Sequence, residues 1–219
     1  MSEHVVVIYP HPDDEAFGAS GTITTFREKG IPVTYLCGTL GEMGRNMGNP
    51  TFATRETLPE IRKKELIKAC EVLDIELKML GYRDKTLEFE SREEIAEHLY
   101  SYLEEIKPSL VITHYPGYAV HPDHDAFGAA AIRAVEMLPE DERPTVWAQA
   151  ISNDHVEVLG KPHIQNNVSD VFRKKFESIL AHKSQADGML SKVRNESDDM
   201  ELAAKTWLGT ETFYVWDFN

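Results

Sequence analysis

Cysteine, positive charge and long apolar stretches are all scarce in this chain of 219 residues. The two cysteines, Cys37 and Cys70, are too few for a disulfide framework, so we expect buried free thiols and a reducing, cytoplasmic setting. Lys and Arg number 23 against 37 Asp and Glu, which gives a formal net charge of −14. Nucleic acid and anionic membranes both require a basic footprint, so neither is expected as the main partner.

No stretch approaches the roughly 20 apolar residues that a membrane-spanning helix needs, and we expect no secretory signal at Met1–His4, which lacks a basic segment. Linkers rich in Pro, Gly or Ser and low-complexity tracts are also missing. Hydrophobic residues make up 42% and charged residues 27%, which is ordinary for a folded domain. The length suits one large domain, so residues 1–219 are expected to form a single domain.

Short β-branched runs alternate along the chain with longer runs of helical spacing. Strands are expected at Val5–Tyr9, Ile31–Leu40, Glu76–Gly81, Leu110–Thr113, Thr145–Ile151 and Thr212–Phe218. Helices are expected at Gly21–Lys29, Leu58–Leu73, Arg92–Ile106, Asp125–Leu138 and Val168–His182. The acidic stretch Asn195–Glu201 is expected to be solvated or to lie on the outer face of a helix. This order predicts an α/β fold, a Rossmann-like three-layer sandwich with a mainly parallel sheet.

Two histidine motifs follow two of the expected strands. Pro-His-Pro-Asp-Asp-Glu occupies residues 10–15, directly after the first strand, and His-Pro-Asp-His-Asp occupies residues 121–125, after the strand at residues 110–113. One such motif alone is usually a turn with a helix cap. Two of them at the ends of two strands favour a shared site, because ligands of parallel sheets bind beyond the carboxyl ends of the strands.

The spacing within each motif suits a metal. His11 and Asp14 are three residues apart, as are His121 and His124, so both members of a pair can converge if the turn is helical. Imidazole nitrogen and carboxylate oxygen suit a divalent cation, Zn²⁺ in particular, although Fe²⁺ also occupies sites of this kind. Two His with one carboxylate and an open fourth position describe a catalytic zinc site, and no Cys lies near either motif.

Further motifs occur in order along the chain: His11–Glu15, Thr39–Gly44, Arg62 with Glu65, Gly81–Asp84, His121–His124 and His182–Gln185. This ordered set resembles the LmbE/PIG-L family of metal-dependent N-deacetylases, and the match runs from Val5 to about Gln185. Within the family, the loop at residues 38–48 is most similar to the deacetylases of bacillithiol biosynthesis, which act on N-acetylglucosaminyl malate. The resemblance therefore implies a small amino-sugar substrate, and it also implies a homo-oligomer, a trimer or hexamer.

The resemblance also implies a division of roles among the motif residues. His11, Asp14 and His124 would hold the zinc, Asp13 would be the general base, and His121, protonated, would assist at the oxyanion. The chemistry supports this division, because zinc lowers the pKa of a bound water to about 7 and a nearby carboxylate can then take its proton.

A second group of residues is expected to bind substrate. The resemblance places Arg62 and Asp84 in the sugar site, where an Asp suits vicinal hydroxyls. Arg45 and Arg62 would pair with an anionic aglycone, since guanidinium matches carboxylate geometry. Glu42 belongs to the same Gly-rich loop as Arg45. Tyr118 would cover the site, although a packing role suits it equally well.

The sequence leaves the roles of several other residues open. Asp123 and Asp125 either orient histidine rings or cap the following helix. His182, late in an expected helix, is interpreted as structural or capping. Three histidines that have no partner pattern are expected at the surface: His98, His155 and His163. The aromatic end, residues 213–218, is expected to close the sheet or form a subunit contact.

Three alternatives to the leading hypothesis remain. The first is a deacetylase of the same family that acts on chitooligosaccharides or another N-acyl amino sugar. The second is a Rossmann-like nucleotide-binding module, which would need a Gly-rich turn where this chain has His-Pro-Asp-Asp. The third is a non-catalytic metal-binding protein, against which the presence of Asp13 beside a full ligand set argues.

Overall fold

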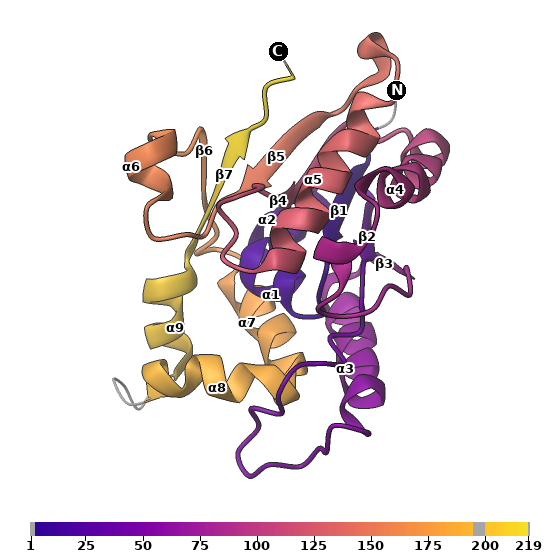
Figure 1. The fold of residues 1–219 in the computed structure, drawn as a ribbon. Helices are drawn as coiled ribbons and strands as arrows, with labels where there is room; N and C mark the ends of the chain where they lie inside the picture. Colours follow the sequence, from indigo (N-terminus) through magenta and orange to yellow (C-terminus); the bar gives the residue numbers. More distant parts are fainter. Residues whose placement is uncertain (1–2, 195–199, 219) are drawn as a thin grey trace.

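The computed structural model describes residues 3–194 and 200–218. Its seven-stranded sheet has the order β3-β2-β1-β4-β5-β7-β6 (Figure 1). The strands are β1 (Val5–Tyr9), β2 (Val33–Cys37), β3 (Glu76–Met79), β4 (Leu110–His114), β5 (Thr145–Gln149), β6 (Ile164–Asn167) and β7 (Thr210–Val215). β1 to β5 are paired in parallel, and only β7 pairs antiparallel, with β5 and β6. The prediction of a mainly parallel α/β sheet is confirmed.

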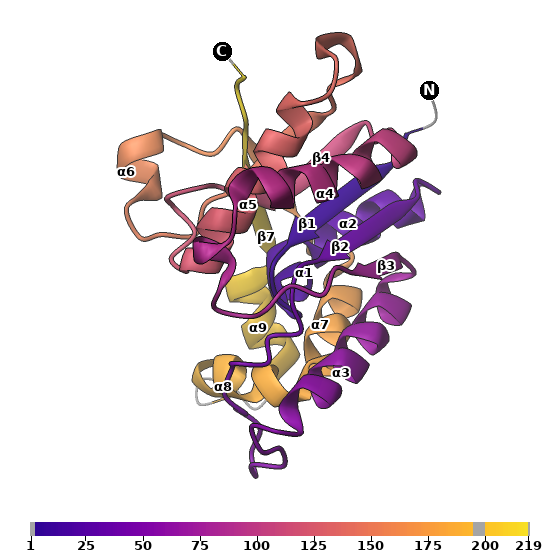
Figure 2. The ribbon, with the colours of Figure 1, turned by 45° about the vertical axis from the view of Figure 1, so that its right-hand side comes forward.

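Helices cover both faces of this sheet, as the expected three layers require (Figures 1 and 2). They are α1 (Asp14–Gly18), α2 (Ser20–Glu28), α3 (Leu58–Leu73), α4 (Arg92–Ile106), α5 (Pro122–Glu136), α6 (His155–Leu159), α7 (Phe172–Ala181), α8 (Lys183–Arg194) and α9 (Met200–Leu208). Short 3₁₀ turns lie at Leu87–Phe89 and Glu140–Glu142. Over the described part of the chain, no helix has the length and apolar character needed to cross a membrane.

The central strand β1 explains the layers, because its side chains alternate between the two faces. Val6 and Ile8 join the core beneath α4 and α5, whereas Val5, Val7 and Tyr9 join the core beneath α2 and α3. All five residues of β1 are buried, on both faces of the sheet. The strand is therefore a continuous apolar run, which is typical of a buried parallel strand. The two free cysteines are buried in the second of these cores, as expected.

Some boundaries differ from the sequence-based expectations. Helix α5 begins at Pro122 rather than Asp125, because proline is well suited to the first helical position and the ring of His121 caps the helix by accepting from the Asp123 N–H. Strand β6 and the short helices α1 and α6 were not expected. The strand is short and lies at the sheet edge, so it lacks a strong apolar pattern.

The carboxyl-terminal region also departs from expectation. Helices α8 and α9 were not predicted, and together with α1 and α7 they enclose a third, smaller core. The acidic stretch expected to be solvated falls mostly on residues 195–199, which lie outside the described residues. Phe213 and Tyr214 of β7 are buried, so this part of the aromatic end packs inside the sheet, between β5 and β6, and β6 forms the edge.

Strand order reverses beside β1, and this reversal positions the site. The chain builds β2 and β3 on one side of β1, then returns to place β4 on the other side. The parallel pairing of Val5 with Leu110 and Val7 with Ile112 puts the carboxyl ends of β1 and β4 side by side. Such a switch point leaves a crevice where α/β proteins bind ligands, and the two histidine motifs emerge there.

Candidate active site

A cavity of about 440 Å³ opens at the carboxyl ends of β1 and β4. Seven of the ten predicted site residues line it: His11, Asp13, Asp14, Arg62, Asp84, His121 and His124. The other three, Glu42, Arg45 and Tyr118, are not among its lining residues. The sequence motifs that lie more than a hundred residues apart therefore meet in one place.

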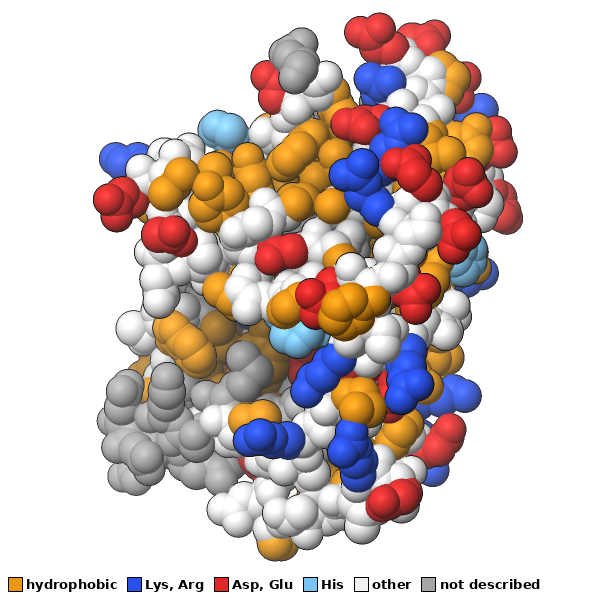
Figure 3. Space-filling model, in the orientation of Figure 1, with side chains coloured by type: hydrophobic (Ala, Val, Ile, Leu, Met, Phe, Trp, Pro, Cys, Tyr) orange, Lys and Arg blue, Asp and Glu red, His pale blue; other side chains and the backbone are white. Residues whose placement is uncertain are grey.

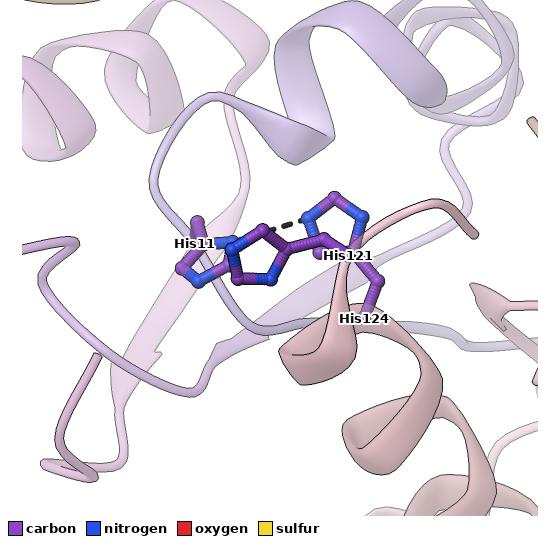
Figure 4. Close-up of side chains that lie close together, drawn as sticks. All are labelled: His11, His121 and His124. Carbon is purple, nitrogen blue, oxygen red and sulfur yellow. Dashed lines mark hydrogen bonds between the residues drawn. The ribbon is translucent and has the colours of Figure 1, made fainter. Parts of the chain in front are cut away.

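The three predicted metal ligands converge on one point. His11 Nδ1 lies 3.1 Å from His124 Nε2 and 3.6 Å from Asp14 Oδ2, and His124 Nε2 lies 3.3 Å from Asp14 Oδ1. A tetrahedral ion with bonds of about 2.0–2.2 Å holds its ligand atoms about 3.3–3.6 Å apart. Figure 4 shows the rings of His11, His121 and His124 gathered together, with the His11–His124 contact drawn as a dashed line. The donor set and its spacing fit a divalent cation such as zinc.

The outer nitrogen of each ligand histidine has a partner that fixes the tautomer. His11 Nε2 lies 3.1 Å from Asp84 Oδ1 and 3.2 Å from Asp123 Oδ2, and ionised carboxylates only accept. His124 Nδ1 lies 3.0 Å from the carbonyl oxygen of Ala119, which also only accepts. Both outer nitrogens therefore carry a proton, which leaves His11 Nδ1 and His124 Nε2 as the ring atoms that could ligate a metal at the shared point.

The electrostatics of this cluster favour a positive charge. Burial alone lowers the pKa of His11, but hydrogen bonds to Asp123 and Asp84 raise it to about 10. Burial acts to raise the pKa of Asp14, but His124 holds it well below its usual range. A bound cation would supply the same positive charge that the extra proton supplies here.

Asp13 occupies a strained backbone position that its neighbours hold in place. Its φ of 99° lies in the region that non-glycine residues seldom adopt. Its N–H donates to Glu15 Oε2 at 3.0 Å, and Arg62 Nη2 lies 3.2 Å from its Oδ2 and also donates to the carbonyl of Pro12. Burial raises the pKa of Asp13 to about 6, although Arg62 acts to lower it. A carboxylate with a pKa near neutrality suits a general base.

Behind Asp13 lies a buried pair, Glu15 and His182, whose Oε1 and Nε2 are 2.6 Å apart. His182 is the C-cap residue of α7, close to the expected place at a helix end, but its ring is fully buried. Burial alone lowers the pKa of His182, and Glu15 raises it above its usual value. Since Glu15 also accepts a hydrogen bond from the Asp13 N–H, the pair connects the end of α7 to the strained backbone at Asp13.

His121 lies beside the ligand cluster, but its ring differs from the expected imidazolium. Its Nδ1 accepts the N–H of Asp123 at 3.1 Å, so no proton can occupy that nitrogen. Burial, followed by His11 and His124, lowers its pKa. The neutral ring therefore donates only through Nε2–H. Val120, the preceding residue, has a φ of 55°, a genuine outlier for a β-branched residue and a second point of strain at the site.

The two aspartates of the second motif, Asp123 and Asp125, have different hydrogen-bond partners. Asp123 is fully buried, and besides contacting His11 it accepts the N–H groups of Lys85 and Leu87 at 2.7 and 3.2 Å. Asp123 therefore orients the His11 ring, which was one of the two interpretations drawn from the sequence. Asp125 instead accepts hydrogen bonds from the N–H groups of Gly117 and Ala119, so it stabilises the loop that precedes α5.

The expected substrate residues are mostly engaged within the protein. Arg62 is only 4% exposed, and its Nη1 donates to the carbonyl of Gly41 at 2.9 Å. Asp84 accepts the Met43 N–H on the oxygen that does not face His11, and Glu42 accepts the Asp84 N–H. The backbone carbonyl of Tyr118 accepts from the N–H groups of residues 151 and 152. These contacts hold the loops around the cavity together.

Two features of the cavity escaped the sequence analysis. His114 ends β4, is buried, and stacks on His124 with ring centroids 4.1 Å apart and planes 12° apart. With Asp14 and His124 it forms an alternative ligand group, and its place at a strand end was the signal that could have found it. Phe17, Ile151 and Trp207 form an apolar wall of the cavity, and Trp207 is 55% exposed. Because Trp207 belongs to the unpredicted α9, no pattern pointed to it.

The histidines outside the motifs are less exposed than expected. His98 and His155 are half-buried, and their Nδ1 atoms contact the hydroxyls of Tyr82 and Tyr214 at 2.8 and 2.9 Å. Both lie at the surface but are partly covered, because each ring packs against aromatic neighbours. His163 is exposed as expected.

Comparison with known proteins places this chain in a family. A model of the PIG-L family, described as GlcNAc-PI de-N-acetylase, matches residues 6–135, more than half of the chain. The chain belongs to this family of deacetylases.

Two named relatives are similar to this chain over its full length. A probable N-acetyl-alpha-D-glucosaminyl L-malate deacetylase 2 of Bacillus cereus is 49% identical over 220 residues, with 100% of both chains covered. The protein of the same name from Bacillus subtilis is 48% identical over the same length, again with 100% of both chains covered. Among solved structures, the N,N'-diacetylchitobiose deacetylase from Pyrococcus horikoshii has a TM-score of 0.76 at 25% identity, covering 98% of this chain and 84% of that chain.

Proposed function

We propose that this chain is a metal-dependent N-deacetylase that hydrolyses the acetamide of N-acetylglucosaminyl malate. The observation that carries the proposal is the convergence of His11, Asp14 and His124 beside Asp13. The names of the 48–49% identical Bacillus relatives support the choice of substrate. The malate conjugate belongs to bacillithiol biosynthesis, a cytoplasmic setting that suits two buried free thiols.

His11, Asp14 and His124 are the residues that would hold the metal, with zinc the first choice and Fe²⁺ suited to the same donors. When bound, zinc would acidify a water molecule and polarise the acetamide carbonyl. Asp84 and Asp123 keep the His11 ring in the orientation that this requires, and the carbonyl of Ala119 does the same for His124. Such outer partners typically change metal affinity by about 10–100-fold.

Asp13 acts on the proton of the attacking water. Its pKa of about 6 leaves the carboxylate ionised at neutral pH, ready to take this proton and later to deliver it to the departing amine. Arg62, at 3.2 Å, keeps the carboxylate directed into the cavity. The Nε2–H of neutral His121 donates to the oxyanion that forms at the acetamide carbon, a contact whose loss typically costs about 3–4 kcal/mol.

The alternative substrate is a chitooligosaccharide, which the structural similarity to a diacetylchitobiose deacetylase favours. A non-catalytic metal-binding role is disfavoured, because such a protein has no need of a strained Asp13 with a raised pKa beside the ligands.

The test compares N-acetylglucosaminyl malate, free N-acetylglucosamine and diacetylchitobiose as substrates of zinc-loaded protein, with amine release followed by fluorescamine. The malate conjugate is expected to have the highest kcat/KM. A higher kcat/KM for diacetylchitobiose would replace the proposed substrate, and release of no amine from any of the three would overturn the proposed activity.

We also propose that residues 1–219 form one domain, because strands from residues 5 to 215 belong to one sheet. Calorimetry should then show a single unfolding transition. Light scattering tests the assembly implied by the family resemblance, for which a mass of three or six chains is expected.

A further inference from the structure

A second cavity, of about 470 Å³, adjoins the active-site cavity. The loop between β2 and α3 forms most of it, and Lys85 also lines it. Gly44 and Lys85 line both cavities, so the two meet at these residues. The second cavity therefore lies within reach of one end of a molecule held at the histidine cluster.

Three exposed cations line this second cavity: Arg45, Arg55 and Lys85. Among the residues that the structure describes, none of the three forms an ion pair within 4.0 Å, although the chain carries a net charge of −14. Figure 3 shows Lys and Arg side chains gathered just below a central His on this face. The cavity is thus a local region of positive charge in an acidic protein.

Arg62 cannot supply the same function. Its guanidinium is buried, and its terminal nitrogens donate to the carbonyls of Gly41 and Pro12 and to Asp13. Turning toward a substrate anion would release Asp13 and leave buried carbonyls unpaired, which is costly. Recognition of an anionic group therefore falls to the exposed cations of the second cavity.

We propose that this second cavity is an anion subsite, in which Arg45, Arg55 and Lys85 bind the carboxylates of the substrate aglycone. The inference rests on the proposed function and deepens it by assigning the part of the substrate that bears negative charge. Guanidinium and ammonium groups form charge-assisted hydrogen bonds with carboxylates. In an N-acetylglucosaminide the acetamide and the aglycone stand on adjacent ring carbons, so adjoining cavities suit the two groups.

The test measures kinetics of the zinc-loaded full chain with and without the cations. Arg45→Gln, Arg55→Gln and Lys85→Gln are made singly and together, and glutamine keeps most of each stem while removing the charge. The substrates are N-acetylglucosaminyl malate and the uncharged methyl N-acetyl-α-glucosaminide. KM for the malate conjugate should rise about tenfold or more for each lost cation, while kcat and the kinetics of the methyl glycoside stay near the wild-type values.

Arg173→Gln is the matched control, because Arg173 lies on α7 with a side chain 83% exposed and has the same change of charge. It should leave KM for the malate conjugate unchanged, which separates a local effect from a change in net charge. Added salt provides a second measurement: KM for the malate conjugate should rise with ionic strength in the wild type and much less in the triple variant.

The outcomes separate the two proposals. If wild-type protein deacetylates the malate conjugate and the triple variant does so with unchanged KM, the anion subsite is wrong and the proposed function stands. Equal losses on both substrates also overturn the subsite, because they indicate damage to the fold or the catalytic groups. If wild-type protein acts on the methyl glycoside and not on the malate conjugate, the proposed substrate itself is wrong.

Discussion

The histidine cluster and the anion subsite adjoin each other, yet their polar groups are partnered in opposite ways. In the cluster, the outer nitrogens of His11 and His124 and the carboxylate of Asp123 all have protein partners. In the subsite, the described part of the chain provides no ion-pair partner for Arg55 or Lys85. Buried polar groups must be paired within the fold, because leaving them unpaired costs several kcal/mol, whereas exposed cations are solvated at little cost. The residues proposed to perform the reaction are thus held by hydrogen bonds within the protein. The cations proposed to select the substrate have fewer such contacts, and that of Arg55 is a weak hydrogen bond to Met43 Sδ.

The largest effect is expected from His124→Ala, which removes a ligand from the paired region. The protein should lose its metal, and activity should fall by more than about 10⁴-fold, since both the activated water and the polarised carbonyl are lost. Metal content by mass spectrometry and amine release measure the two effects. His163→Ala, at an exposed histidine, should keep both. Full metal content in His124→Ala would show that other residues, such as His114, form the site.

Asp13→Asn should separate catalysis from metal binding. Asparagine tolerates the left-handed backbone of this position, so the fold and the metal should be retained. The value of kcat should fall by about 10²–10⁴-fold, the usual contribution of a general base. Full activity in a metal-loaded Asp13→Asn protein would rule out the assignment of Asp13.

His121→Asn tests the neutral donor without removing the helix cap. Asparagine is a good N-cap residue, so α5 should keep its first turn, but the ring Nε2–H is gone. We expect kcat to fall by about 10²–10³-fold with little change in Tm. A wild-type kcat would show that His121 only caps the helix.

The pH dependence of kcat/KM tests the ionisation of Asp13. Its pKa is raised to about 6, so the base is ionised above that pH and protonated below it. Activity should fall about tenfold per pH unit on the acid side, with a midpoint at or below about 6 because a bound cation lowers the pKa. The remaining activity of Asp13→Asn should lack this acid limb. An acid limb that persists in the variant would assign the titration to another group.

The smallest effect is expected at Trp207, on the apolar wall. Trp207→Ala should raise KM about threefold to tenfold, because the indole offers an apolar face to the sugar ring, and Trp207→Phe should restore part of the loss. Substrate should also quench the fluorescence of the wild type more than that of the Phe variant. Unchanged KM in both variants would show that the exposed indole does not contact substrate.

The fold was predictable where local pattern decides it. The β-branched run Val5–Tyr9 and the helical spacing of Leu58–Leu73 reflect burial on two faces and on one face, and both elements lie at the predicted bounds. Strand β6 and helix α9 were missed, because a half-exposed edge strand and a helix in which Ala204 is the one buried residue among those described carry weak local patterns.

The sequence by itself determined that His11, Asp13, Asp14, His121 and His124 follow strands of a parallel sheet, because strand order and three-residue spacing are properties of neighbouring residues. Only the tertiary structure decided which nitrogen of each ring faces the shared point, since those protons are held by Asp84, Asp123 and Ala119. It also decided that Arg62 is enclosed while Arg55 stays open to solvent. Burial and hydrogen-bond partners depend on segments far apart in the chain, and no local pattern records them.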